Sequence, residues 1–177
     1  MANDESVHHY KRVLDCISCL PKNIITHHGR ENLSEFVLHG LCSQGCFNLK
    51  KAAYFVDNPD FNCIKGVTGF CQSEGNLDWN EIWEDPESFS LIAKSSPFNQ
   101  KVRSFAAAST KKNNDPVEQF LSTIVKEIGF NNPNYCSWTT KHLNHGILVF
   151  EKGEATNDLF EQHFLNSLHL LGFCPIF

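Results

Sequence analysis

The sequence lacks the features that would direct it to a nucleic acid or into a membrane. Its 177 residues carry a formal net charge of −5 and no block of basic residues, which argues against a nucleic-acid partner. No stretch of about 18 apolar residues occurs, so the sequence predicts no membrane-spanning helix. Residues 1–10 are polar and acidic, unlike a signal peptide, and lead us to expect a cytoplasmic protein.

Motifs of common enzymes are also missing. There is no Gly-x-Ser-x-Gly nucleophile elbow, no Gly-x-x-x-x-Gly-Lys-Ser/Thr phosphate loop and no Gly-x-Gly-x-x-Gly turn after a strand. The His-x-Glu and Pro-Cys-x-x-Cys pair of zinc deaminases is absent as well. The sequence thus identifies no catalytic residue and no cofactor, and favours a protein that is not an enzyme.

What the chain has in quantity is phenylalanine and cysteine. Fifteen Phe stand against one Met and three Trp, which predicts a core of rigid aromatic rings. In a reducing compartment the eight cysteines are expected to be buried small hydrophobic residues or metal ligands rather than disulfides. The length fits one domain. We expect a disordered arm over residues 1–8 and a single domain over residues 9–177.

Apolar residues at helical spacing predict helices at both ends of the chain and in its second half. The middle, residues 77–94, is expected to be helical or irregular and to be interrupted at Pro86. The other expected helices are His9–Leu20, ended by Pro21; a segment from Glu31 or Asn32 to a C-cap at Gly45; Pro116–Ile128, with Asp115 as N-cap; and a last helix from Asn157 to Gly172.

Alternating apolar residues predict strands that come in hairpins between these helices. Gly66 and Gly69 indicate a bulge or the close approach of another backbone. Hairpins separated by helices predict the α+β class, with a central, mainly antiparallel sheet flanked by helices. The terminal helices should pack on one face, and the middle segment should cover the other. The expected strands are Cys46–Val56, Phe61–Cys71, Val102–Ala108, Tyr135–His142 and Gly146–Lys152.

Aromatic side chains gather in the segment that should cover one face of the sheet. Aromatic walls with a few polar groups are typical of small-molecule pockets. Packing in an ordinary core is the alternative explanation, because aromatic rings also dominate cores of this size. The candidate ligand-binding residues are Phe70, Trp79, Trp83, Phe98 and Phe105.

Cysteine and histidine spacing raises a second possibility. Cys16 and Cys19 have the CxxC spacing of metal sites and redox thiols. His39 and Cys42 would share one face of a helix and could complete a set of four zinc ligands. The spacings match no common zinc ribbon or finger. Packing of these thiols between two helices is the simpler explanation.

Several of the predicted elements follow one another in a recognisable order. They are the helix Leu33–Cys42, the hairpin Phe47–Val56 with Cys63–Phe70, and the strand Gly146–Phe150 before the helix Phe160–Leu171. This order resembles a GAF domain over roughly residues 30–172. The resemblance implies a six-stranded antiparallel sheet between helices, a ligand pocket on one face and dimerisation through the terminal helices. PAS and profilin-like folds share this outline.

One departure from this family affects its enzymatic members. GAF proteins that reduce free methionine sulfoxide carry a Gly-Val-Cys-Gly stretch, whereas this chain has Thr68 in place of the cysteine, between Val67 and Gly69. The resemblance therefore does not extend to that activity.

The sequence as a whole predicts a non-catalytic, GAF-like sensory or regulatory module. Such a module would bind a small molecule in an aromatic-lined pocket and signal as a homodimer through its terminal helices. A dimerisation or interaction domain without a ligand is the alternative. A metal or thiol protein built on Cys16, Cys19, His39 and Cys42 is the third hypothesis.

Overall fold

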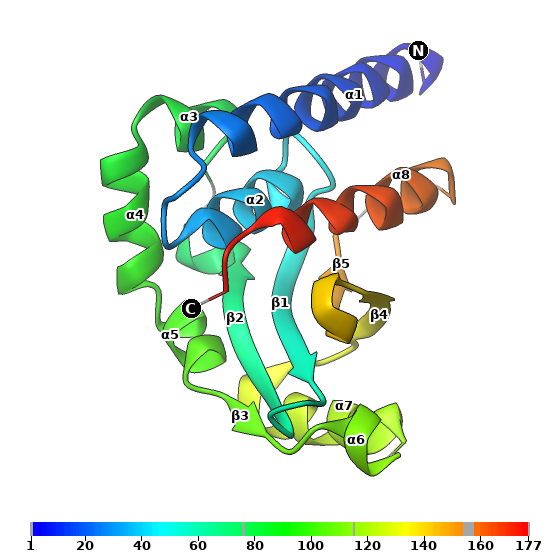
Figure 1. Ribbon diagram of the computed structural model, residues 1–177. Coiled ribbons are helices and arrows are strands. Elements are labelled where there is room, and N and C mark those ends of the chain that lie inside the picture. The colour runs from blue at the N-terminus through cyan, green and yellow to red at the C-terminus, as the bar shows by residue number, and fades with distance from the viewer. Residues whose placement is uncertain (1, 76, 115, 154–157, 177) are drawn as a thin grey trace.

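Helices cover both faces of a five-stranded antiparallel sheet in the computed structural model of the chain (Figure 1). The structure describes residues 2–75, 77–114, 116–153 and 158–176. The strand order is β3-β2-β1-β5-β4, and every neighbouring pair is antiparallel. The predicted α+β class is confirmed, although the family resemblance implied a sixth strand. The strands are β1 (Leu49–Asn58), β2 (Cys63–Cys71), β3 (Ala106–Ala107), β4 (Asn134–Thr139) and β5 (His145–Lys152).

The helices differ greatly in length. A π-helical turn, Val125–Gly129, continues α7, and a 3-10 turn, His169–Phe173, follows α8. Across the described residues, no helix combines the length and the apolar character needed to cross a lipid bilayer. The helices are α1 (Ala2–Thr26), α2 (Leu33–Cys42), α3 (Trp79–Glu84), α4 (Pro86–Ser95), α5 (Pro97–Arg103), α6 (Thr110–Asn113), α7 (Val117–Ile124) and α8 (Asp158–Leu168).

Each face of the sheet has its own apolar cluster. Ala52 and Tyr54 of β1 face α1, α2 and α8, whereas Ala53 and Phe55 face α5 and α7. The terminal helices therefore share one face, as predicted, whereas α5 and α7 cover the other. The middle segment, residues 77–94, was expected on that second face, and this prediction was wrong, because α3 and α4 pack beside α2 in a third cluster around Phe36.

Local capping explains why the middle segment breaks into short helices. Asp78 begins α3 with a capping box that includes Glu81. The side chain of Asp85 then accepts a hydrogen bond at the start of α4, where Pro86 is the first residue, and Ser96 does the same for α5. Each cap satisfies backbone N–H groups that a helix start leaves open. The predicted interruption at Pro86 is confirmed.

The boundaries predicted for the first helix were wrong at both ends. Helix α1 begins at Ala2, so residues expected to form a disordered arm are helical, and it continues through Pro21 to Thr26. The apolar stripe runs on beyond the proline, because Leu20 and Ile24 are both buried. Packing against α2 thus outweighs the helix-breaking tendency of proline.

Two further predictions failed for reasons of packing. Val102, expected to open a strand, lies in α5, and only Ala106–Ala107 pair with β2 in that region. Gly45 does not cap α2, since Ser43 occupies that position. A Cβ on Gly45 would lie 2.6 Å from Asp78 Oδ1, so the glycine serves the close approach of α3. The predicted N-cap Asp115 and the predicted start of the last helix, Asn157, fall outside the described residues.

Helix α5 lies directly against β2 at two glycines. A Cβ on Gly66 would collide with the carbonyl group of Val102, and one on Gly69 would lie 2.7 Å from Val102 Cγ2. The pairing of β2 with β1 also skips Val67, which forms a bulge. Both features predicted from these glycines, the bulge and the close approach, are confirmed.

Replacing Gly66 with alanine should destabilise the protein by roughly 2 kcal/mol or more, because the new methyl group would force α5 away from β2. Urea unfolding followed by circular dichroism measures the effect. Gly172→Ala is the matched control, because the atom nearest to its new Cβ would lie 3.9 Å away, at an ordinary contact distance. We expect this variant to change the free energy of unfolding by less than about 0.5 kcal/mol. Equal midpoints for the two variants would contradict the close approach.

Candidate functional site

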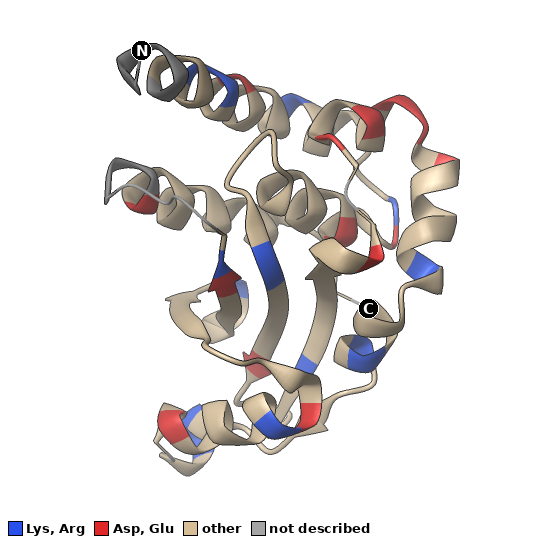
Figure 2. Ribbon diagram, turned by 180° about the vertical axis from the view of Figure 1, so that it is seen from behind, with Lys and Arg blue, Asp and Glu red and all other residues tan. Residues whose placement is uncertain are grey.

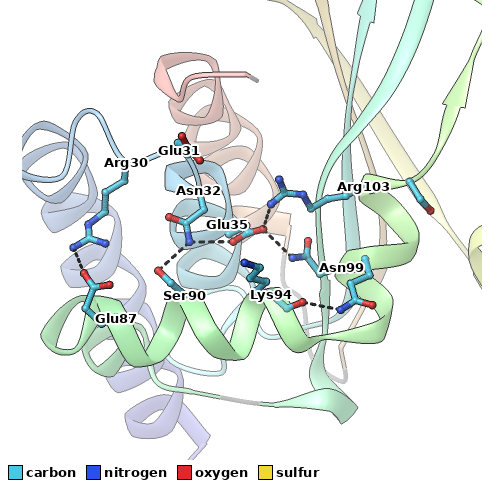
Figure 3. Close-up of a pocket in the computed structure, with 11 residues that line it drawn as sticks. Arg30, Glu31, Asn32, Glu35, Glu87, Ser90, Lys94, Asn99 and Arg103 are labelled. Carbon is cyan, nitrogen blue, oxygen red and sulfur yellow. Dashed lines mark hydrogen bonds and ion pairs between the residues drawn. The ribbon is translucent and has the colours of Figure 1, made fainter.

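A polar cavity of about 800 Å³ lies between the start of α2, one face of α4 and helix α5 (Figure 3). Glu87, Ser90 and Lys94 line its α4 side, because spacings of three and four residues place them on one face of that helix. All eleven lining residues are polar or charged. They are Arg30, Glu31, Asn32, Glu35, Glu87, Ser90, Lys94, Asn99, Gln100, Arg103 and Ser104.

The carboxylate of Glu35 is the centre of the cavity wall. Only 2% of this residue is exposed. Its Oε1 accepts hydrogen bonds from Asn99 Nδ2 at 2.9 Å and Arg103 Nη1 at 2.6 Å. Its Oε2 accepts one from Asn32 Nδ2 at 3.1 Å. A buried carboxylate is tolerated when it is paired and hydrogen-bonded in this way. Glu35 also lies in the first turn of α2, where the positive end of the helix dipole stabilises a negative charge.

Asn99 ties this carboxylate to the edge of the sheet. Its Oδ1 accepts hydrogen bonds from Gly69 N at 2.9 Å and from Thr68 Oγ1 at 3.3 Å. Its Nδ2 donates to Ala93 O at 2.8 Å as well as to Glu35. The side chain of Asn99 therefore takes the place of a neighbouring strand at this point of β2.

His39 satisfies the other backbone group of Gly69. Its Nε2 lies 3.3 Å from Gly69 O, so this nitrogen carries the proton and donates. Burial lowers the pKa of His39 to about 4, against smaller upward effects of the Gly69 hydrogen bond and of the Glu35 and Glu74 carboxylates. The ring is therefore neutral near pH 7.

Not every charge in the cavity is used within the protein. Arg30 and Glu87 form an ion pair, with Nη2 and Oε1 2.8 Å apart. The side chain of Arg103 stays 54% exposed although it contacts Glu35. Among the described residues we find no partner for the ammonium group of Lys94 or for the carboxylate of Glu31. A ligand in the cavity would meet these groups.

No protein-family model, curated protein or solved structure shows a significant match to this chain. The resemblance to a GAF domain therefore stays a prediction based on the order of the elements. The chemistry of the cavity has to be inferred from its own geometry.

The five aromatic residues predicted to line a pocket do not meet in one place. Phe70, Trp79 and Trp83 belong to or pack against the apolar cluster under α1 and α2. Phe98 and Phe105 lie in the cluster on the opposite face of the sheet. None of the five lines the polar cavity. Their rings contribute to the two apolar clusters instead.

Sequence reasoning missed the residues that build the cavity. Glu35 gives one usable signal, because it is the only acidic or basic residue apart from His39 in the otherwise apolar helix α2. Asn99 and Arg103 give none, since polar residues on a short helix near proline are ordinary. Their role depends on contacts with Glu35, which lies on a distant segment.

The structure does not bring together the candidate zinc ligands that the sequence offered as a possibility. All eight cysteines lie among the described residues, and none is in a disulfide. The buried thiol of Cys16 donates to a backbone carbonyl of α2, and burial raises the pKa of Cys42 well above its ordinary range. In the described part of the chain, no three His, Cys, Asp or Glu side chains are placed to hold a metal. Cys19 and His39 thus join no ligand set there.

Charged residues are distributed unevenly along the helices α3, α4 and α5 (Figure 2). Acidic residues gather on α3 and at the start of α4, where Glu81, Glu84 and Glu87 lie. Lys94 and Arg103 lie at the ends of α4 and α5. Of these residues, Glu87, Lys94 and Arg103 line the cavity, and Glu87 and Arg103 have ion-pair partners within the protein.

Replacing Glu35 with glutamine should destabilise the protein by about 2 kcal/mol, because an amide N–H would face the donors of Asn99 or Arg103. Thermal and urea unfolding measure the change. Glu31→Gln, in the same cavity but exposed, is the matched control and should change stability by less than about 0.5 kcal/mol. Equal effects of the two variants would show that the buried network does not stabilise the fold.

His39 should make the protein less stable as the pH falls from about 6.5 to 4. In this window the unfolded chain binds a proton at His39 that the folded chain does not, so the stability present above pH 6.5 is lost towards pH 4. At about 1.4 kcal/mol per pKa unit, the free energy of unfolding should fall by up to about 3 kcal/mol across this window.

The variant His39→Gln is the control for this pH dependence. Its amide can still donate to Gly69 but does not titrate. Urea midpoints measured between pH 7 and 5, where most carboxylates stay ionised, should fall for the natural protein and stay flatter for the variant. Parallel profiles would exclude His39 as the titrating group.

Proposed function

We propose that the protein is a non-catalytic sensory or regulatory module that binds a small polar molecule in the cavity between α2, α4 and α5. The observation that supports it is the state of Arg103. The buried carboxylate of Glu35 holds its guanidinium at 2.6 Å, while half of the side chain remains exposed at the cavity. A charged group fixed in this way loses little freedom when it binds a ligand.

The size of the cavity fits this role. Small-molecule sites typically have volumes of about 300–1,000 Å³, and this cavity has about 800 Å³. The proposal moves the ligand from the predicted aromatic pocket to a polar one, because Phe98 and Phe105 lie on a different face of the sheet from Phe70. Arg30, Lys94 and Arg103 supply charged hydrogen-bond donors, which bind anionic groups well.

Helix α2 offers a physical route from the cavity to the terminal helices. Its first turn carries Glu35, and its buried residues Val37 and Leu41 share an apolar cluster with Val13 and Leu20 of α1. A ligand that draws Arg103 away from Glu35 would favour a different position of α2. Because α1 packs against α2, the position of α1 would shift with it. Such coupling needs a differential interaction with two states, which the Arg103–Glu35 contact can provide.

The output that we propose is pairing of two copies through the terminal helices, in the cytoplasm. Helices α1 and α8 project past the sheet on the same side (Figure 1) and meet where Tyr10 Oη lies 3.3 Å from His163 Nε2. Leu14 on α1 and Leu165 on α8 are 40% and 41% exposed. A dimerisation domain without a ligand is the second candidate function, favoured by these same exposed leucines.

The ligand proposal is tested by thermal-shift and native mass spectrometry screening of small polar metabolites. We expect at least one to bind the natural protein and to bind Lys94→Gln about tenfold more weakly, because a charge-assisted hydrogen bond is lost. Lys94 has no intramolecular partner among the described residues, so the variant should fold normally. Lys101→Gln, an exposed lysine of α5 outside the cavity, is the matched control. Hits that bind both variants equally would place the site elsewhere.

The dimer proposal is tested by size-exclusion chromatography with light scattering. The natural protein should form dimers, and Leu14→Glu together with Leu165→Glu should give monomers, because charges cannot be buried unpaired in an apolar interface. Leu91→Glu on α4, where the leucine is 70% exposed, is the control and should leave the dimer intact. A natural protein that is monomeric at all concentrations would refute the proposed pairing.

A further inference from the structure

The charges that line the cavity form a balanced set. Three are cationic, from Arg30, Lys94 and Arg103, and three are anionic, from Glu31, Glu35 and Glu87. Four of them form two ion pairs within the protein, Arg30 with Glu87 and Arg103 with Glu35. One ammonium group and one carboxylate are left over.

The two remaining groups are Lys94 on α4 and Glu31 beside the start of α2. Both are exposed at the cavity, and neither has a partner among the described residues. An anionic ligand would satisfy Lys94 and leave Glu31 as an unfavourable neighbour, whereas a cationic ligand would do the reverse. A molecule with both an acid and an amine would satisfy both groups.

The lining also limits the rest of the ligand. None of the eleven lining residues has an apolar side chain, so a large hydrocarbon side chain would cover polar groups without giving them hydrogen bonds. The hydroxyl and amide groups of Ser90, Asn32 and Gln100 favour a ligand that is itself polar along its length.

We propose that this cavity takes a small hydrophilic zwitterion, a polar amino acid or a short polar peptide with a free amino group and a free carboxylate. The ligand carboxylate lies towards Lys94 and the exposed edge of Arg103, and the ligand ammonium lies towards Glu31. The inference rests on the proposed function and adds to it the chemical class of the ligand.

Isothermal titration with four probes tests this assignment. Glutamine carries both charges; N-acetylglutamine lacks the ammonium group; glutaminamide lacks the carboxylate; leucine carries both charges on an apolar side chain. We expect glutamine to bind about tenfold or more tightly than each of the other three. Glycylglycine and triglycine, run in parallel, distinguish a free amino acid from a peptide by which binds more tightly.

Two variants assign the charges individually. Lys94→Gln should weaken glutamine about tenfold and leave glutaminamide unchanged, and Glu31→Gln should weaken glutamine and leave N-acetylglutamine unchanged. Lys101→Gln and Glu84→Gln, which remove the same charges outside the cavity, should have no effect on glutamine.

The outcomes separate this inference from the proposed function. If N-acetylglutamine binds as tightly as glutamine, or if a metabolite from the screen binds through Lys94 while amino acids and peptides do not, the zwitterion is wrong and the cavity remains a ligand site. If no polar molecule binds in either experiment, both proposals fall.

Discussion

The open edge of β2 is the constraint on which the rest of this structure depends. Strand β3 pairs with β2 at Ile64 and Lys65 alone, and the backbone of Gly69 further along needs other partners, because buried N–H and C=O groups are costly when left unpaired. Side chains supply them, with Asn99 accepting from the N–H and His39 donating to the carbonyl. Two helices are thereby fixed to one residue of the sheet, α5 through the asparagine and α2 through the histidine.

The same solution creates the cavity. Asn99 can serve β2 because Glu35 and Ala93 orient its amide, and Glu35 can be buried because Asn99, Asn32 and Arg103 surround it with donors. The helices that meet at this carboxylate leave a polar space between them, with charged side chains at its rim. The contacts that satisfy the backbone groups at the edge of β2 are thus the same contacts that build the cavity. A ligand that perturbs Arg103 would therefore also change the stability of the fold.

The sequence predicted those parts of the structure that depend on local patterns. The antiparallel hairpins, the helical break at Pro86 and the two glycines that admit α5 all have signals within a few residues. The break predicted at Pro21 failed, because packing against α2 carries α1 through that proline. The cavity has no such signal, because its residues come from separate helices and meet only once the chain has folded. The aromatic residues were assigned to a pocket because a ring that packs in a core and a ring that lines a ligand site look alike in a sequence.

The distance along the chain between Glu35 and its partners has a consequence for synthesis. The carboxylate precedes Asn99 by 64 residues and Arg103 by 68, so α2 emerges from the ribosome well before the groups that donate hydrogen bonds to this carboxylate. At elongation rates of about 5–20 residues per second, this interval lasts several seconds. During it, the apolar face of α2 can dock on α1, but its first turn has to stay in water until α5 arrives. The cavity is therefore complete only after α5 has been synthesised and has packed against α2.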